Sequence, residues 1–242
     1  MIEDVLSQLV PTGTLRAGIN MANKLLVTGE TLSGDPDGVG PEFAAKIAGH
    51  LGVPITYVPF SSPGELADAV EDDVWDVGLI GAEPTRAEKI VFTAAYVEIE
   101  ATYMLPAGSV LQSIEEVDQP GIRIAVSERS AYDLFLTRNL KHAELVRAKG
   151  LPGAMKLFLN EKLDALAGLR PLMIQGLRDI PGARILDGRF TAVQQAVGMA
   201  KANDAAAALL SDFVEESKEG GLVARLIEKH GVIGKLSVAQ AG

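Results

Sequence analysis

Polar residues that could bind an anion follow an apolar segment near residue 80. Arg86 comes shortly after WDVGLIG (75–81), in a turn that also contains Glu83. A guanidinium can hold a carboxylate through two parallel hydrogen bonds, and N–H groups at a helix start can add to them. Thr85 and Glu88 have the spacing of a capping box, so we expect a helix to begin at Arg86. An exposed arginine that only covers its own helix would show the same pattern, and the sequence leaves both interpretations open.

A second polar group follows the apolar segment GIRIAVS (121–127). It contains Ser127, Arg129 and Ser130, and Ser130 has the capping-box spacing with Asp133. These side chains therefore lie where a strand ends and a helix begins. Ligands of α/β proteins bind at the carboxyl ends of strands, so two such places facing each other could hold one anion.

Alternating strand and helix signals surround both polar groups. In the first hundred residues, the patterns predict strands at 14–19, 54–60 and 75–81, and helices at 40–51 and 62–70. Ser62 and Glu65 form a further capping box at the start of the second helix. This order predicts a parallel sheet with right-handed crossovers.

The second half of the chain repeats the pattern. We expect strands at 121–127 and 162–169, helices at 130–146, 152–159, 205–217 and 221–231, and extended crossings at 93–109 and 189–201. The prediction is an α/β fold of two lobes with a central cleft, joined by two hinge strands. Lobe 1 would be residues 1–101 with 196–242, and lobe 2 residues 102–195.

Composition argues against several classes of partner. The 242 residues carry a formal net charge of −10, which disfavours nucleic acid and anionic membranes. No cysteine is present, so disulfides and thiolate metal sites are excluded. No apolar run approaches the roughly 18 residues of a membrane span. Glu3 and Asp4 stand where a signal peptide needs positive charge, so we expect no leader in the chain as written, although a trimmed protein would look the same.

The histidines, glycines and tryptophan suggest no further site. His50, His142 and His230 fall in separate segments without the spacing of metal ligands, so no metal site is expected. The glycines of residues 29–40 lack a dinucleotide or P-loop pattern, and no cofactor is expected. Trp75 opens a strand, and core or hinge packing is its expected role.

Seven segments resemble the motifs of one protein family, in the family's order. They are GTLRAGI (13–19), DGVGPEFAAKIAGHLGVPITYVPF (37–60), WDVGLIGAEPTRAEKIVFTAAYV (75–97), GIRIAVSERSAYDLFL, LDALAGL, QQAVGMAK (194–201) and EGGLVARLIEKHG (219–231). The chain thereby resembles the type II periplasmic solute-binding proteins of ABC transporters, particularly the amino-acid-binding family 3. The resemblance covers nearly the whole chain, and it implies two lobes that close on a ligand.

The resemblance also implies roles for single residues. Arg86 matches the family arginine that holds the ligand's carboxylate, and Ser130 matches the second-lobe Ser/Thr that donates to it. Family members that bind α-amino acids place an acid after the strand LDALAGL, where this chain has Leu169 and Arg170. This departure points to a carboxylate ligand without an amine, unless Glu83 supplies the missing acid.

The rest of the expected site and its partners follow from the same resemblance. Asn20 and Asn23 replace the aromatic or acidic residues common after the first strand. Together with Glu83, Arg129 and Arg170 they are expected to line the site. The expected partners are a small carboxylate, either an amino acid or a related organic acid, and an ABC permease. We expect a monomer without membrane insertion, located in the periplasm by resemblance or in the cytoplasm if Met1 is the natural start.

Two other functions remain open from the sequence. Cyclohexadienyl dehydratases resemble solute-binding proteins, and Glu83, Glu98 or Glu100 could supply a general acid for such an enzyme. A cytosolic ligand-sensing module is the other alternative, which the missing leader favours. We expect a binding protein rather than an enzyme, because no nucleophile–base pair or metal motif supports another chemistry.

Overall fold

The computed structural model describes residue 6 and residues 9–240, and this part of the chain forms two compact units. Unit 1 extends to Glu98 and resumes at Gln194, and unit 2 is Ile99–Val193. The predicted crossings after residues 101 and 195 lie close to these positions. Glu3 and Asp4, on which the leader prediction rests, lie outside the described residues.

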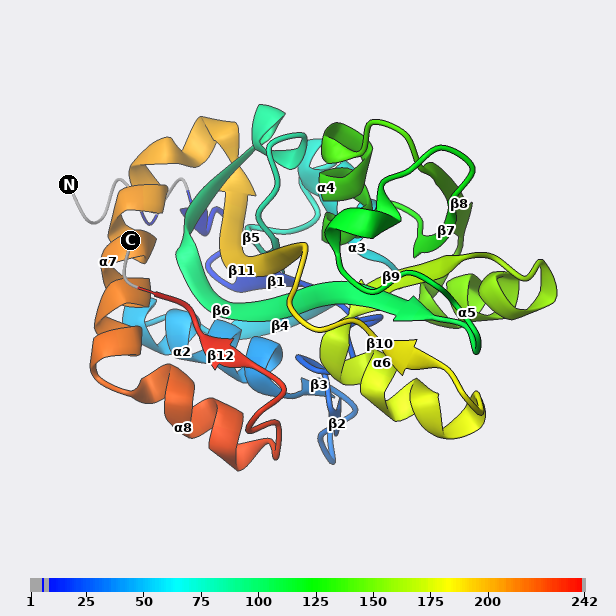
Figure 1. Ribbon diagram of the computed structural model, residues 1–242. Helices are drawn as coiled ribbons and strands as arrows, with labels where there is room; N and C mark the ends of the chain where they lie inside the picture. The colour runs from blue at the N-terminus through cyan, green and yellow to red at the C-terminus, as the bar shows by residue number, and fades with distance from the viewer. Residues whose placement is uncertain (1–5, 7–8, 241–242) are drawn as a thin grey trace. The chain divides into compact units, whose positions relative to one another are not determined.

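Two long strands carry the chain between the units (Figure 1). They are β6 (Ile90–Leu105) and β11 (Thr191–Ala200), which cover most of the extended segments predicted at 93–109 and 189–201. Each strand contributes to the sheet of unit 1, and β6 also contributes to that of unit 2.

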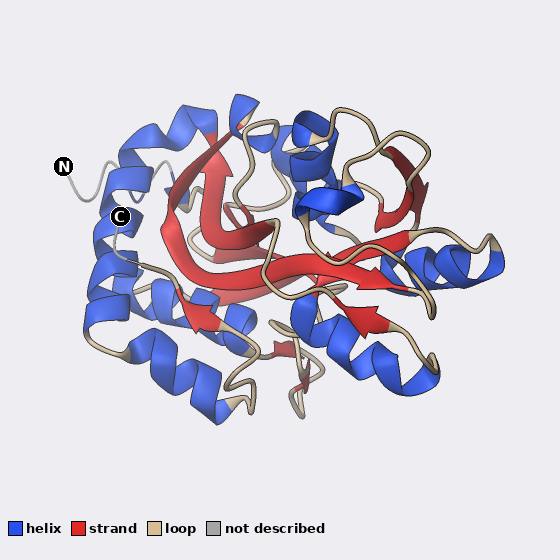
Figure 2. Ribbon diagram, in the orientation of Figure 1, coloured by secondary structure: helices blue, strands red, loops and turns tan. Residues whose placement is uncertain are grey.

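Unit 1 contains a mixed sheet in the order β4-β1-β5-β11-β6. β1 (Leu15–Asn20) lies between β4 (Ile55–Phe60) and β5 (Val77–Gly81), and all three are parallel. Parallel neighbours require crossover connections, which α2 (Val39–Leu51) and α3 (Pro63–Asp68) supply. Figure 2 shows the helices in blue and the strands in red. These elements match the strands and helices predicted in the first hundred residues.

The core of unit 1 follows from the helical and strand periodicities. Phe43 and Ile47 are fully buried on one face of α2, which ends at Gly52 in the left-handed conformation (φ 70°). The Ser62 side chain caps α3 by accepting from the Glu65 N–H at 3.2 Å, as predicted. Trp75 is buried, and its indole Nε1 donates to the Leu66 carbonyl at 3.1 Å. The expected core role of Trp75 is therefore confirmed.

Shorter elements complete unit 1. The hairpin of β2 (Gly29–Glu30) and β3 (Pro36–Asp37) precedes α2. Near the C-terminal end, α7 (Asp204–Glu219) and α8 (Leu222–Lys229) are the two helices predicted there, and α8 packs against α2 and α7. β12 (Ser237–Val238) then pairs with β6.

Unit 2 repeats the arrangement with a sheet in the order β6-β9-β7-β8. β7 (Arg123–Ser127) lies between β8 (Glu144–Ala148) and β9 (Ala165–Leu169), and these three strands are parallel. The connections contain α4 (Ala131–Asn139) and α5 (Gly150–Asn160). Three elements of unit 2 were not predicted: β8, α6 (Arg170–Gly176) and β10 (Arg184–Ile185).

The predicted helix at 130–146 is wrong beyond Asn139, where α4 ends. The Asp118 carboxylate accepts from the backbone N–H groups of Lys141, His142 and Ala143 at 2.8–2.9 Å, which holds this segment in a turn. The chain then enters β8, which pairs along its whole length with β7. Both interactions involve partners distant in sequence, so local helical spacing could not reveal them.

A search of the described residues finds no helix with the length and apolar character needed to span a membrane.

Candidate functional site

In unit 1, the predicted residues lie around the carboxyl ends of two neighbouring parallel strands. Asn20 is the last residue of β1, and Ile19 of β1 pairs with Leu79 of β5. Glu83 and Arg86 follow the end of β5. This edge of a parallel sheet is where α/β proteins bind ligands, so these side chains are placed as a binding site requires.

Arg86 is buried beside the end of β5 rather than at the start of a long helix. Arg86 is 6% exposed, and its Nη1 donates to the Gly81 carbonyl at 2.7 Å. The predicted helix is wrong: only the 3₁₀ turn η2 (Arg86–Glu88) forms before β6 begins. A guanidinium at the carboxyl end of a parallel strand can hold a carboxylate through two hydrogen bonds, so Arg86 is a candidate for an anion contact.

The predicted capping box at Thr85 is also wrong. Thr85 has helical torsions (φ −63°, ψ −37°), and within the described chain its side chain accepts no capping hydrogen bond. A capping residue normally has an extended backbone, which turns its side chain toward the helix start. The Arg86 guanidinium, and not a set of helix N–H groups, is therefore the candidate for an anion contact in unit 1.

Asn20 and Asn23 shape the loop that follows β1. The Asn20 Oδ1 accepts from the Ala22 N–H at 3.1 Å, and the Asn23 Oδ1 accepts from the Leu25 N–H at 3.2 Å. These are Asx turns, in which the side-chain oxygen replaces a backbone acceptor. Asn23 is 7% exposed, and its carbonyl also accepts from the Leu26 and Val27 N–H groups. Within the described part of the chain, each carboxamide keeps its NH₂ group for another acceptor.

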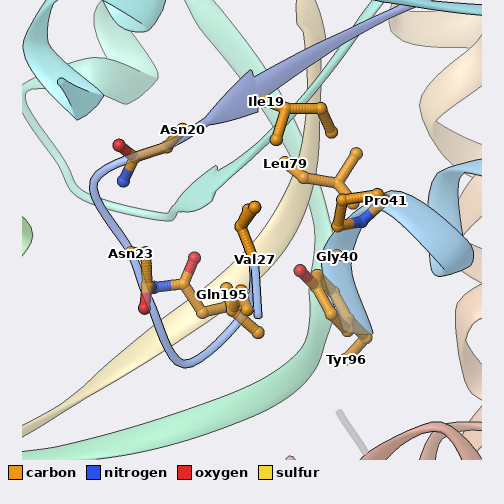
Figure 3. A pocket seen from close by; sticks show the side chains of 10 residues that line it. Ile19, Asn20, Asn23, Val27, Gly40, Pro41, Leu79, Tyr96 and Gln195 are labelled. Carbon is orange, nitrogen blue, oxygen red and sulfur yellow. The ribbon is translucent and has the colours of Figure 1, made fainter. Parts of the chain in front are cut away.

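A small pocket lies beside this loop in unit 1 (Figure 3). Its polar lining consists of Asn20, Asn23, Tyr96 and Gln195, and the side chains of apolar residues form the rest. The cavity volume is about 10 Å³, which is room for one water molecule. Tyr96 and Gln195 were not predicted as site residues, because only the pairing of β11 with β5 and β6 brings them to this loop.

In unit 2, the predicted residues also lie at the carboxyl ends of parallel strands. Ser127 ends β7, and Arg129 and Ser130 follow it. Leu169 ends β9, which pairs in parallel with β7, and Arg170 is the next residue. Ser127, Arg129, Ser130 and Arg170 therefore gather at one edge of the sheet of unit 2.

Ser130 caps α4 as predicted, but Asp133 has a different partner from the one expected. Ser130 Oγ accepts from the Asp133 N–H at 3.1 Å, and Ser130 is 6% exposed. The Asp133 carboxylate accepts from the backbone N–H of Arg129 at 2.7 Å and from the Arg147 Nε at 3.0 and 3.2 Å. Arg129 has a positive φ of 57°, an uncommon conformation for a residue other than glycine, and the bond to Asp133 holds it.

The start of α4 also contains a neutral hydroxyl. Burial raises the pKa of Tyr132 to about 12, although hydrogen bonds with the Ser130 and Ser127 side chains oppose the shift. The phenol therefore stays protonated at physiological pH. It connects the two serines that the sequence placed at this strand end.

Arg170 makes contacts within unit 2. Its Nε donates to the Glu100 carboxylate at 2.9 Å, and its Nη2 donates to the carbonyls of Leu186 and Gly188. Arg189 forms a second ion pair with Glu100 at 3.7 Å. The Arg170 side chain thus orders the segment before β11 and neutralises Glu100.

A carboxylate–histidine cluster in unit 1 was missed from the sequence. Asp37, Glu42 and His230 place possible metal-ligand atoms within 4.8 Å of one another. However, Glu42 accepts from the Lys229 Nζ at 2.8 and 2.7 Å and contacts the His230 Nε2 at 2.8 Å. Burial raises the pKa of Glu42, but the hydrogen bonds from Lys229 and His230 outweigh it and lower the pKa below its ordinary value. The Glu42 carboxylate is thus already engaged by the Lys229 ammonium and the His230 ring.

Solved structures show which fold this protein has. An ancestral amino-acid-binding protein, a precursor of cyclohexadienyl dehydratase, aligns with a TM-score of 0.72 at 19% identity, covering 94% of this chain and 98% of its own. A mutant of ArgBP from T. maritima gives 0.73 at 19% identity, covering 96% and 99%. A Streptococcus pneumoniae amino acid ABC transporter substrate-binding protein bound to L-arginine gives 0.73 at 19%, covering 92% and 96%. The fold is that of the type II periplasmic binding proteins, as predicted.

The sequence places the chain within this class. It belongs to the bacterial extracellular solute-binding proteins, family 3, whose family model matches residues 24–233. The family prediction is therefore confirmed.

One curated relative is an enzyme. The cyclohexadienyl dehydratase of Pseudomonas aeruginosa is 26% identical over 148 residues, which are 60% of this chain. The matched region spans 54% of that relative, about half of its length.

Proposed function

We propose that this protein is the substrate-binding component of an ABC importer and binds a small carboxylate solute. The observation that carries the proposal is the buried Arg86 guanidinium at the carboxyl end of β5. Ser130 caps a helix at the equivalent end of β7 in unit 2. Arg86 and Ser130 are the two positions that match the family's carboxylate-binding residues. Relatives named as amino-acid-binding or bound to L-arginine support this class of solute.

The proposed solute contacts differ in how much of each side chain is already engaged. Arg86 would bind the carboxylate in unit 1, with Asn20, Asn23 and Glu83 lining the remainder. Ser130 and Arg129 would be the solute contacts of unit 2. For Arg170 the proposal leaves only Nη1, because Nε and Nη2 donate to Glu100 and to two backbone carbonyls.

A thermal-shift screen over amino acids, keto acids, dicarboxylates and aromatic acids tests the proposal. A true solute at 100 times its Kd adds about 2.7 kcal/mol to the free energy of unfolding. Arg86→Ala should abolish the shift of the best hit, and Arg86→Lys should weaken it, because lysine cannot form two parallel hydrogen bonds. Arg123→Ala is the control. Arg123 is the first residue of β7, whereas the candidate site residues of unit 2 lie at the other end of this strand, from Ser127 on. An equal shift in Arg86→Ala and wild type would refute the assignment of Arg86.

Ser130 has a matched control elsewhere in the chain. Ser62 caps α3 through the same bond, at 3.2 Å to the Glu65 N–H, and is not a proposed solute contact. Ser62→Ala and Ser130→Ala should each lower stability by about 1 kcal/mol through the lost cap. Only Ser130→Ala should also weaken solute binding. Equal solute affinity in both variants would remove Ser130 from the site.

A dehydratase on the same scaffold is the second candidate, favoured by the relative from Pseudomonas aeruginosa. Glu98 accepts from the Gln194 Nε2 at 3.2 Å, and Glu100 is engaged by Arg170 and Arg189. Incubation with prephenate, followed by detection of product, tests this activity. Stoichiometric binding without product excludes it.

A further inference from the structure

Tyr96 carries a buried hydroxyl that the site described above does not use. The residue lies on β6 and is fully buried, and its ring stacks on Phe43 with the ring centres 4.6 Å apart. Its Oη has no hydrogen-bond partner among the described protein residues. Buried hydroxyls in native proteins are nearly always hydrogen-bonded, because desolvation without a partner is unfavourable. A group other than the described protein residues is therefore expected to form a hydrogen bond with this hydroxyl.

The Tyr96 hydroxyl lies where such a group can bind. Figure 3 shows it directed into the pocket of unit 1, which Asn23 and Gln195 also line. Gly40 stands beside it, and a Cβ on this residue would lie 3.7 Å from the Tyr96 Oη. The Asn23 Oδ1 is used by the Leu25 N–H, so Asn23 offers its NH₂ group, whereas Gln195 offers both a donor and an acceptor.

The lining sets the charge and size of the occupant. Among the described residues, no aspartate, glutamate, lysine or arginine lines the pocket. Burial raises the pKa of Tyr96 far above its ordinary value, so the phenol remains neutral and able to donate. A cavity of about 10 Å³ admits a single oxygen- or nitrogen-sized group, and two or more polar partners are present to bind it.

We propose that this pocket binds one uncharged, hydroxyl-sized group, held by Tyr96 Oη with Asn23 and Gln195. The group has two possible sources, an ordered water molecule or a hydroxyl of the bound solute. Asn20 and Asn23 belong both to the pocket and to the proposed solute site, so the second source rests on the proposed function. A solute hydroxyl bound here would select hydroxylated acids over their deoxy analogues, because loss of that bond would leave the buried phenol unpaired.

Thermal unfolding of Tyr96→Phe, without added solute, tests whether a water molecule binds the Tyr96 hydroxyl. This variant removes one oxygen and keeps the ring that stacks on Phe43. If a water molecule completes the hydroxyl, the substitution should lower the Tm by about 2–4 °C. Tyr57→Phe is the reference variant, because the Tyr57 hydroxyl donates to the Pro41 carbonyl at 3.2 Å. Its change in Tm shows the effect of losing one such hydrogen bond. A hydroxyl that is truly unpaired predicts the opposite sign, an unchanged or higher Tm.

Matched acids test the solute hydroxyl. The probes are lactate and propionate, malate and succinate, serine and alanine, and threonine and 2-aminobutyrate. If the solute supplies the group, the hydroxylated member of a pair shifts the Tm of wild type more, and Tyr96→Phe removes the difference. If water supplies it, no pair is separated, yet Tyr96→Phe still lowers the Tm.

The combined results separate this inference from the proposed function. A Tm of Tyr96→Phe equal to or above that of wild type, with no pair of acids distinguished through Tyr96, overturns the pocket assignment. If Arg86→Ala loses every Tm shift caused by the acids, this result bears only on the role of Arg86 as the carboxylate contact, and not on the pocket. If no acid shifts wild type, the proposed carboxylate solute fails, and the solute-free comparison of Tyr96→Phe still decides whether water binds the pocket.

Discussion

Asp133 should hold the start of α4 in unit 2, and its removal tests that role. The carboxylate accepts a hydrogen bond of 2.7 Å from the Arg129 N–H and forms an ion pair with Arg147. Asp133 is 2% exposed, whereas the Arg147 side chain is 41% exposed. Asp133→Ala therefore removes a charged acceptor from a backbone donor in an unusual conformation, together with one half-exposed ion pair.

The two losses have different sizes. A hydrogen bond to a charged acceptor contributes about 1.5–3 kcal/mol, and an exposed ion pair contributes about 0.2–1 kcal/mol. We expect Asp133→Ala to lower the free energy of unfolding by about 2–3 kcal/mol, which corresponds to a fall in Tm of about 5–10 °C. Arg147→Ala removes the ion pair and the hydrogen bond from its Nη2 to the Thr137 Oγ1, and it leaves the bond between Arg129 and Asp133 in place. It should cost less, about 1 kcal/mol.

Urea unfolding followed by far-UV circular dichroism measures the difference. Asp133→Asn should fall between the two alanine variants, since an amide oxygen can still accept from the Arg129 N–H without the charge. The interpretation fails if Asp133→Ala and Arg147→Ala are destabilised equally. That result would mean that the bond to Arg129 contributes nothing and that the left-handed turn holds itself.

Two further predictions concern unit 1. Gly38 has φ 145°, and a Cβ there would lie 2.2 Å from the Leu26 carbonyl, so Gly38→Ala should cost about 2 kcal/mol or more in urea unfolding. Gly34 has φ 87° with no atom within 4 Å of a Cβ, so Gly34→Ala should cost only about 1 kcal/mol, and equal losses would argue against the clash. Glu42 has a lowered pKa in the folded state, so its contribution is present above its ordinary pKa of 4.5 and is lost as the pH falls through the folded value. The Tm of wild type should therefore fall more on acidification than the Tm of Glu42→Gln. Parallel profiles of Tm against pH would show that Glu42 is not responsible.

Much of the fold could be predicted because periodicity and capping are local properties. The spacing of Phe43 and Ile47 and the cap at Ser62 identified α2 and α3, and both helices formed as expected. The errors arose where distant partners decide the conformation. β8 exists because it pairs with β7, and the segment before it is turned by Asp118.

The site could be predicted only in part, for a related physical reason. The positions of Arg86 and Ser130 after strands follow from the order of elements, which the sequence carries. The direction of a side chain does not, and Arg86 turns back onto the Gly81 carbonyl. Tyr96 and Gln195 come to the pocket through sheet pairing, which no spacing along the chain reveals.

The burial of Trp75 has a practical consequence for every unfolding experiment on this protein. Trp75 is the chain's single tryptophan, and it lies in the core of unit 1 with its indole bonded to Leu66. Its emission therefore reports on the surroundings of one unit, and unit 2 contributes no tryptophan signal. Comparing the emission midpoint with the circular dichroism midpoint would reveal whether the two units unfold together. The wild-type chain already carries this optical label, without any added dye or substitution.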